Sequence, residues 1–230
     1  MKRYEDLDAE LRRVLDEVRQ QMTTTVISYP ERNPRDRVWG ANNYPGNCSG
    51  KVALGFIDKL QADSMFELCA GSGTNYDMCL DYGVPYCGVD LNPNPVRDGI
   101  KSMDFTDMSQ EFPDEIRTAD MVFSHMPYPG INRIKYSNGA WKGSPELAKR
   151  DIQNMPFAQG MQEINKAHMR AYHTMKPGAF MVMLVGEIRA NGKFYSMNQA
   201  LCLPGEFYQS YVKLQHNTWS GRQNRSYGNS

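Results

Sequence analysis

Residues 123–128, with the sequence FSHMPY, follow a short apolar segment and have the residue types of a recognition loop. The imidazole of His125 and the backbone carbonyl of Met126 can each accept a hydrogen bond from an exocyclic amine. Pro127 restrains the backbone, and the ring of Tyr128 can stack on a flat ligand. This combination predicts a site that holds a nucleobase by its amine and its ring, although Tyr128 could also be a half-buried tyrosine at a strand end.

A second loop of this kind lies at residues 66–74, with the sequence FELCAGSGT. Gly71 and Gly73 remove side chains from the turn, so a ligand can approach the backbone closely. Asp90 ends the next predicted strand, nineteen residues after Gly71, where an acidic side chain suits the two hydroxyls of a ribose. In an open α/β sheet, ligands bind beyond the carboxyl ends of the strands. The loop therefore predicts a nucleoside-containing cofactor, and the alternative is an ordinary tight turn.

The spacing of these residues fits both NAD and S-adenosylmethionine. The third glycine of the pyrophosphate-binding pattern would fall at Tyr76, where that pattern requires a small residue. Glu67 would suit the cationic amino group of a methionine moiety better than a pyrophosphate. A cofactor loop paired with an amine-holding loop therefore favours methyl transfer from S-adenosylmethionine.

Composition limits the class of protein further. At 230 residues, one domain over residues 1–230 is the expectation. The five cysteines are odd in number and lack CxxC spacing, which indicates neither a zinc site nor a disulfide framework, and we expect a reducing environment. There is no signal-peptide pattern and no apolar run near the roughly 20 residues of a membrane span. The sequence therefore predicts a soluble, cytoplasmic protein. Its formal net charge at pH 7 is zero.

Apolar periodicity and turn residues predict the order of the elements. Strands and helices alternate through most of the chain, which predicts an α/β fold with a Rossmann-like, doubly wound and mostly parallel sheet. The continuous apolar run at 180–185 is typical of a strand covered on both faces. The predicted helices are 4–22, 51–60, 75–82 and 156–175, and the predicted strands are 64–69, 86–90, 121–124, 180–185 and 207–214, with loops at 23–50 and 131–151.

The motifs ELCAGSGT, GVDLNP, SHMPY and MKPGAFMVMLVGEIR together resemble the class I amino-methylating DNA methyltransferases, which modify adenine N6 or cytosine N4. The resemblance covers about residues 40–215. In that family a loop of the type DPFAGSGT binds S-adenosylmethionine, and a loop of the type (D/N/S)PPY holds the target amine. The resemblance implies that the catalytic loop is His125, Met126, Pro127 and Tyr128.

The same resemblance implies a cofactor site. Residues 43–47 look like the segment that closes over the methionine end, and Asp104 stands where the family contacts the adenine amine, although a turn-capping role suits it nearly as well. The implied cofactor-binding residues are Tyr44, Pro45, Gly46, Asn47, Glu67, Ala70, Gly71, Ser72, Gly73, Thr74, Asp90, Leu91, Asp104 and Ser124.

The catalytic loop departs from the family pattern at two positions. His125 replaces the usual Asp, Asn or Ser, and Met126 replaces the first proline. A neutral imidazole offers one acceptor nitrogen, whereas a protonated one can only donate, and the reference pKa of about 6.5 places this change near neutrality. The loop therefore predicts either an active enzyme with His125 as the acceptor or altered, weak or lost chemistry.

Two segments combine basic and aromatic residues, as a phosphate-contacting surface does, although charged loops are often only solvated. Residues 131–150 carry five basic residues against Glu146, and residues 188–230 carry five against Glu206. The predicted partner is DNA, double- or single-stranded, or RNA, bound through the 131–151 loop and the basic tail at 215–230. The candidate contacts are Arg133, Lys135, Lys142, Arg222 and Arg225.

The remaining features leave several alternatives open. His168 and His173 are predicted to be surface or partly packed residues, His216 could border the target pocket, and no metal-ligand pattern is present. No segment is large enough for a dedicated target-recognition domain, so specificity should be short or loose, or be completed by a partner. Adenine N6 is favoured over cytosine N4. The alternatives are a non-catalytic nucleic-acid-binding relative and an RNA or small-amine methyltransferase.

Overall fold

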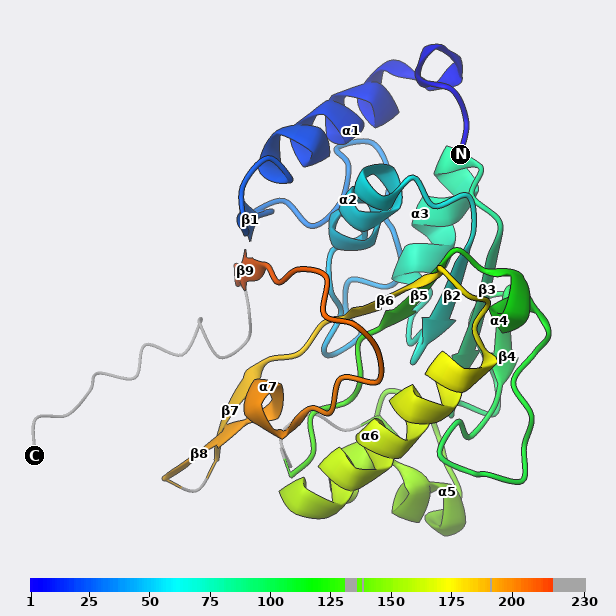
Figure 1. The fold of residues 1–230 in the computed structure, drawn as a ribbon, viewed down its shortest axis with the longest axis vertical. Coiled ribbons are helices and arrows are strands. Elements are labelled where there is room, and N and C mark those ends of the chain that lie inside the picture. Colours follow the sequence, from blue (N-terminus) through cyan, green and yellow to red (C-terminus); the bar gives the residue numbers. More distant parts are fainter. Residues whose placement is uncertain (131–135, 138, 191, 217–230) are drawn as a thin grey trace, which may run out of the picture.

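The computed structural model describes residues 1–130, 136–137, 139–190 and 192–216. Its centre is a five-stranded sheet in which every pair of neighbouring strands is parallel, with the order β4-β3-β2-β5-β6 (Figure 1). This confirms the predicted α/β, Rossmann-like fold. The strands are β2 (Met65–Leu68), β3 (Tyr86–Asp90), β4 (Ile100–Ser102), β5 (Met121–Ser124) and β6 (Phe180–Met183).

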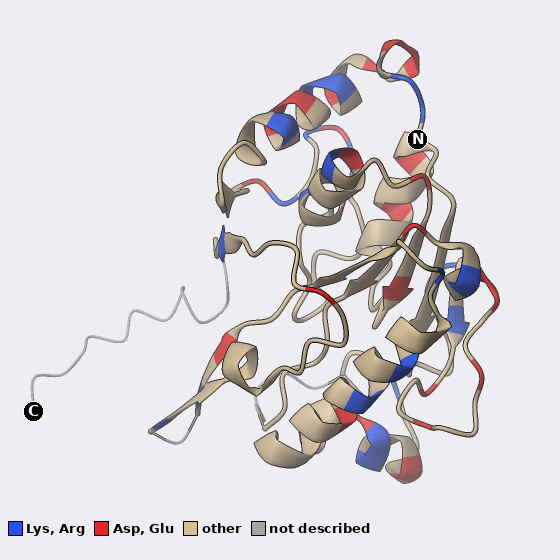
Figure 2. Ribbon diagram, in the orientation of Figure 1, with Lys and Arg blue, Asp and Glu red and all other residues tan. Residues whose placement is uncertain are grey.

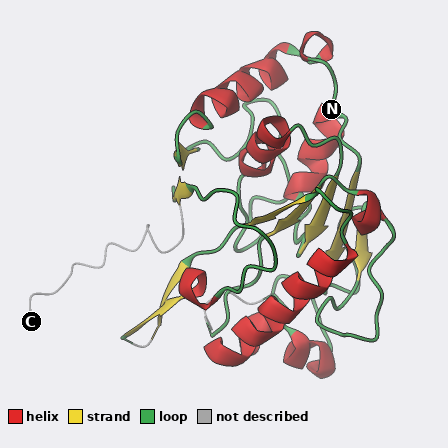
Figure 3. Ribbon diagram, in the orientation of Figure 1, coloured by secondary structure: helices red, strands yellow, loops and turns green. Residues whose placement is uncertain are grey.

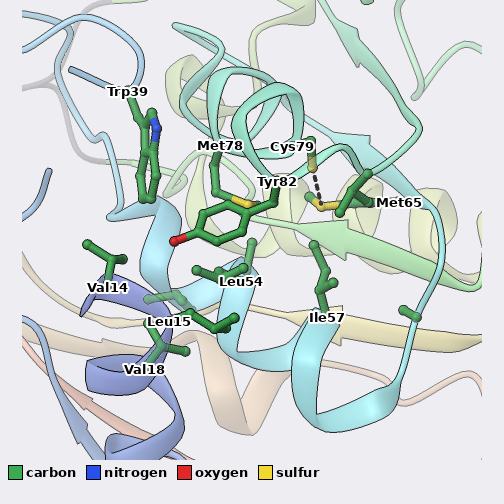
Figure 4. Close-up of a cluster of buried hydrophobic side chains, with 14 of the residues drawn as sticks. Val14, Leu15, Val18, Trp39, Leu54, Ile57, Met65, Met78, Cys79 and Tyr82 are labelled. Atoms are coloured by element: carbon green, nitrogen blue, oxygen red, sulfur yellow. Dashed lines mark hydrogen bonds between the residues drawn. The ribbon is translucent and has the colours of Figure 1, made fainter. Parts of the chain in front are cut away.

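Helices cover both faces of this sheet because successive strand residues point to opposite sides. Met65 and Phe123 pack in one hydrophobic cluster, together with α2 (Gly50–Leu60) and α3 (Thr74–Tyr82). Figure 4 shows part of this cluster, in which Leu54 and Ile57 lie near Met78 and Tyr82, and the sulfur of Met65 lies 3.9 Å from the thiol of Cys79. Phe66 and Val122 belong to the other cluster, which includes α4 (Glu115–Thr118) and α6 (Phe157–Thr174).

The N-terminal helix lies against α2 rather than against the sheet. It is α1 (Ala9–Gln21), and it begins after Asp8, whose side chain accepts a hydrogen bond of 2.8 Å from the backbone N–H of Leu11. The short turn η1 (Tyr4–Asp6) precedes this cap, so the helix predicted at 4–22 is divided in two. The buried ammonium of Lys51 on α2 donates to Glu17 of α1 over 2.9 Å, which joins the two helices.

Several short elements differ from the predictions. The strand expected at 207–214 is wrong in extent and place: only β9 (Val212–Leu214) forms, and it pairs with β1 (Val26–Ser28) outside the main sheet. Strand β4 and the antiparallel hairpin of β7 (Glu187–Ala190) and β8 (Lys193–Ser196) were not predicted, and neither were the short helices. These helices are α4, α5 (Pro145–Arg150), η2 (Ile152–Asn154) and α7 (Met197–Ala200).

Strand β6 lies at an edge of the sheet, and this corrects the expectation that it is covered on both faces. All four of its residues are only partly buried. The connection from α7 to β9 passes this side of the sheet as a long loop (Figure 3), with Tyr208 in edge contact with Phe180 at 5.4 Å between ring centroids. In the part of the chain that the structure describes, no helix is both long and apolar enough to cross a bilayer.

Candidate functional site

The glycine loop after β2 is a tight turn held by Asp90. Cys69, Gly71 and Gly73 have positive φ angles of 62°, 54° and 77°. Glycine adopts such angles without steric cost, which explains why it stands at positions 71 and 73. One carboxylate oxygen of Asp90 accepts from the N–H of Gly71 at 2.8 Å, and the other accepts from Asn92 at 2.9 Å. Burial raises the pKa of Asp90, and the two backbone N–H groups oppose this rise.

A small cavity of about 80 Å³ lies beyond the carboxyl ends of β2, β3 and β5, and we call it the inner cavity. It brings together most of the residues predicted from the sequence. Those that line it are Tyr44, Pro45, Gly46, Asn47, Glu67, Ala70, Gly71, Thr74, Asp90, Leu91, Asp104, His125 and Pro127.

Three of the predicted cofactor residues support the loop instead of lining the inner cavity. The hydroxyl of Ser72 donates to Asn47 at 2.8 Å and so ties the glycine loop to the segment around Tyr44. A side chain at Gly73 would meet Arg97 at 2.6 Å, and Ser124 is buried below the loop. Their roles in the structure are therefore packing and positioning.

Glu67 lines the inner cavity, but its carboxyl group is already engaged. Its two oxygens lie 2.6 Å from the amide nitrogen of Asn75 and 2.5 Å from the hydroxyl of Tyr86. Burial raises the pKa of Glu67 to about 8, against the effect of these two hydrogen bonds. At pH 7 the group is therefore mostly neutral, which weakens it as a partner for the cationic amine that the sequence suggested.

Asp104 also lines the inner cavity and caps its own turn, which was the second of the two roles suggested by the sequence. One oxygen accepts from the N–H and the hydroxyl of Thr106, at 2.9 and 2.6 Å. The other accepts from Arg150 at 2.6 Å. Asp104 is therefore held in place at the cavity wall by residues on both sides of it.

The described part of the 131–151 loop lies over the inner cavity. The rings of Tyr136 and Tyr44 are 5.8 Å apart, and Trp141 and Asp151 line the same cavity. The carboxylate of Asp151 is buried and accepts from the hydroxyl of Ser137 at 2.7 Å, which anchors the loop. The sequence indicated only nucleic-acid contact here, and its polar and aromatic composition did not reveal this covering role.

Further lining residues were also missed by the sequence reasoning. They come from segments adjoining the predicted motifs, so the only available signal was proximity in the chain. Besides Tyr136, Trp141 and Asp151, they are Cys48, Cys69, Asn75, Phe105, Thr106, Phe123, Arg150 and Ile152.

The SHMPY loop (residues 124–128) is held by packing at the position where the methyltransferases that it resembles have a proline. Met126 is buried, and its sulfur lies 3.4 Å from the thiol of Cys69 in the glycine loop. The rings of His125 and Tyr128 meet edge to face, with centroids 5.9 Å apart. The two loops identified from the sequence are therefore in direct contact.

His125 is neutral at physiological pH. Burial, with a smaller effect from the positive charge of Lys213, lowers the pKa of His125 to about 4. Its imidazole can therefore accept a hydrogen bond at pH 7. Burial therefore moves the titration of this imidazole well below neutral pH.

The other three histidines differ in burial and in hydrogen bonding. His168 is completely buried, which corrects its prediction as a surface or partly packed residue, and its Nε2 lies 2.7 Å from the hydroxyl of Ser124. It faces inward because Ile164, Ala167 and Ala171 lie on the same side of α6. His173 is exposed, whereas His216 lies 2.8 Å from the Ser28 hydroxyl.

A second, much larger hollow of about 2260 Å³ adjoins the inner cavity, and we call it the outer groove. It is lined by β6, by the loop that carries Phe207 and Tyr208, and by Met126 and Tyr128. The residues that line both the inner cavity and the outer groove are Tyr44, Pro45, Gly46, Asn47, Cys48, His125 and Tyr136.

The predicted nucleic-acid contacts fall mostly outside the described residues. This applies to Arg133, Lys135, Arg222 and Arg225, whereas Lys142 is described and exposed. Figure 2 shows that basic and acidic residues are mixed along α1, whereas α6 carries the acidic Glu163 and the basic Lys166 and Arg170. Among the residues that the structure describes, no group of three or more His, Cys, Asp or Glu side chains is placed to hold a metal ion.

Comparison of the sequence with protein-family models and with curated proteins found no match.

Proposed function

We propose that this protein is an S-adenosylmethionine-dependent methyltransferase that acts on an exocyclic amine of a nucleic-acid base, with adenine N6 favoured. The observation that supports this most is the place of His125, which lines both the inner cavity and the outer groove. A neutral acceptor at that junction can hold an amine against a methyl donor. Transfer of tritiated methyl groups to unmethylated DNA, followed by nucleoside mass spectrometry, tests the activity.

The residues around the inner cavity fit the proposed cofactor. Gly71 lets a ligand approach the backbone, and the buried Asp90 keeps lone pairs for ribose hydroxyls beside its two backbone bonds. Leu91, Phe105 and Ile152 offer apolar walls for an adenine ring. The cavity is smaller than the roughly 300–1,000 Å³ usual for ligand sites, so the rings of Tyr44 and Tyr136, which line it 5.8 Å apart, would have to move for the cofactor to enter.

The bound cofactor would supply a methyl group on a sulfonium, which needs no further activation. The protein then has to orient the amine. His125 accepts one hydrogen bond and the Met126 carbonyl accepts the second, which turns the nitrogen lone pair toward the inner cavity. Tyr128 stacks on the base, while Tyr136 and Trp141 keep water out.

A non-catalytic nucleic-acid-binding relative is the second candidate. It is favoured by the replacement of the family's usual acceptor and first proline by His125 and Met126. The neutral state of His125 and the burial of Met126 against Cys69 support catalysis instead, because they supply the acceptor and the rigidity that the replaced residues would provide.

Replacement of Asp90 by alanine should weaken binding of S-adenosylhomocysteine by about 1–3 kcal/mol, because hydrogen bonds to the ribose are lost and the Gly71 N–H loses its acceptor. Isothermal titration calorimetry measures this loss. Asp114→Ala, whose side chain is 99% exposed and lies away from the inner cavity, is the matched control and should bind normally. Tighter binding of NAD than of S-adenosylhomocysteine by the wild type would contradict the proposed cofactor.

Replacement of Tyr128 by alanine should weaken binding of the target oligonucleotide by about 1–3 kcal/mol through lost stacking. Affinity for S-adenosylhomocysteine should stay constant, because Tyr128 lines the outer groove and not the inner cavity. Fluorescence anisotropy with the labelled oligonucleotide measures the change. Tyr4→Ala removes an exposed ring near the N-terminus as a control, and equal affinity of both variants would argue against stacking.

A further inference from the structure

The outer groove has the dimensions of a site for a polymer. Its volume of about 2260 Å³ is more than twice the upper end of the roughly 300–1,000 Å³ usual for small ligands. It extends along the whole of β6, because Phe180 at the start of the strand and Val185 beyond its end both line it. His125 and Tyr128 lie at its strand-end side, where the proposed chemistry takes place.

Positive charge predominates among the described side chains that line the outer groove. Five of them are cationic and two are acidic. A polymer with a regular negative charge would be favoured there, because each neutralised phosphate releases counterions. The cations are Arg32, Lys59, Lys176, Arg189 and Lys213, and the acids are Glu187 and Glu206.

Large aromatic rings along the groove are exposed to solvent. Tyr172, Phe194, Phe207 and Tyr208 are 41, 56, 61 and 68% exposed, although such rings usually bury most of their surface. Exposed rings in a positively charged groove are what proteins use to hold unpaired bases, at about 1–3 kcal/mol per base. In a duplex the base faces are already stacked, so these rings would have no face to contact.

We propose that the outer groove binds a single, unpaired polynucleotide strand and leads its target base to His125. This rests on the proposed function, and it specifies the substrate as single-stranded rather than duplex nucleic acid. The other polymer that could use this groove is an extended polypeptide, which would pair with the free edge of β6. The excess of cations favours the polynucleotide.

A fluorescent oligothymidylate tests the groove separately from methyl transfer, because thymine has no exocyclic amine. We expect the wild-type protein to bind it more tightly than a blunt duplex of the same length. Phe207→Ala and Tyr208→Ala should each weaken binding about 5- to 150-fold. Lys213→Gln should reduce the slope of log affinity against log salt by about 0.7.

Matched controls outside the groove are Tyr4→Ala and Lys101→Gln, which should leave oligothymidylate affinity and salt dependence unchanged. Ultraviolet cross-linking of oligothymidylate to the wild type should label the segment with Phe207 and Tyr208, so the outcome does not depend on how the variants fold. Tighter binding of the duplex, or affinity unchanged by both aromatic substitutions, would overturn the proposal.

The proposal and the function on which it rests can fail separately. Suppose that oligothymidylate binds, that Phe207→Ala and Tyr208→Ala weaken its binding, and that no nucleic acid is methylated. The proposal for the outer groove would then stand, and the proposed methyltransferase activity would be wrong. If the protein methylates duplex DNA and neither Phe207→Ala nor Tyr208→Ala changes the rate, the methyltransferase activity would stand and the proposal for the outer groove would be wrong. Protection of the β6 amides from hydrogen exchange by an added polypeptide, with no binding of oligothymidylate, would identify a protein-docking edge and contradict the proposal.

Discussion

Replacement of His125 by alanine is expected to slow methyl transfer by about 10²- to 10³-fold, because an oriented contact made mainly in the transition state is lost. Cofactor affinity should change far less, since Asp90 and the glycine loop remain in place. Single-turnover kinetics with saturating S-adenosylmethionine separates the two quantities. His125→Asp, which restores an acceptor of the family's usual type, should keep activity.

The pH dependence of the wild-type methyl-transfer rate should also show that His125 acts as a hydrogen-bond acceptor. His125 has a pKa of about 4, so the acceptor is present at neutral pH and is lost only as the pH falls toward 4. We expect a rate that is flat from about pH 7 to about pH 5.5, after correction for the folded fraction. Asp114→Ala, whose side chain is 99% exposed and lies outside both hollows, is the control and should keep the wild-type profile. If His125→Ala is as fast as the wild type, the SHMPY loop does not hold the amine.

Acid should destabilise the fold through His168 by about 3 kcal/mol between pH 6.5 and pH 4. Burial lowers the pKa of His168 from 6.5 to about 4. Within this window the unfolded chain binds a proton that the folded chain does not bind, so the free energy of unfolding falls as the pH falls. Below about pH 4 both states are protonated and this loss is complete.

Urea unfolding at pH 7.0 and pH 4.5 measures the effect of His168. His168→Gln should be less stable than the wild type at pH 7, because the Ser124 contact and the core packing change, but should lose less stability on acidification. His173→Gln, on the exposed side of the same helix, should follow the wild type at both pH values. An equal acid-induced loss in wild type and His168→Gln would show that His168 is not the titrating group.

Much of the fold could be predicted from local sequence. The glycine loop, the strand that ends at Asp90 and the Pro-Gly turn after α6 each have short-range signals, and parallel strands bring their carboxyl ends to one edge. This is why Gly71, Asp90 and His125, far apart in sequence, meet at the inner cavity. The motifs predicted which loops line the inner cavity.

The remaining features depend on contacts between distant segments. Tyr136 and Trp141 cover the inner cavity only because Asp151 anchors their loop, and composition gives no sign of this. The burial of His168 follows from which side of α6 meets the sheet, and the exposure of β6 follows from strand order. The raised pKa of Glu67 and the lowered pKa of His125 are consequences of burial, which sequence does not reveal.

The central claim is tested most directly by incubating the wild type and His125→Ala with tritiated S-adenosylmethionine and unmethylated single-stranded and duplex DNA, followed by nucleoside mass spectrometry. We expect labelled N6-methyladenine from the wild type, more of it from the single strand, and at least about 100-fold less from the variant. Absence of methylated base from every DNA and RNA offered to a wild type that binds both cofactor and nucleic acid would contradict the claim.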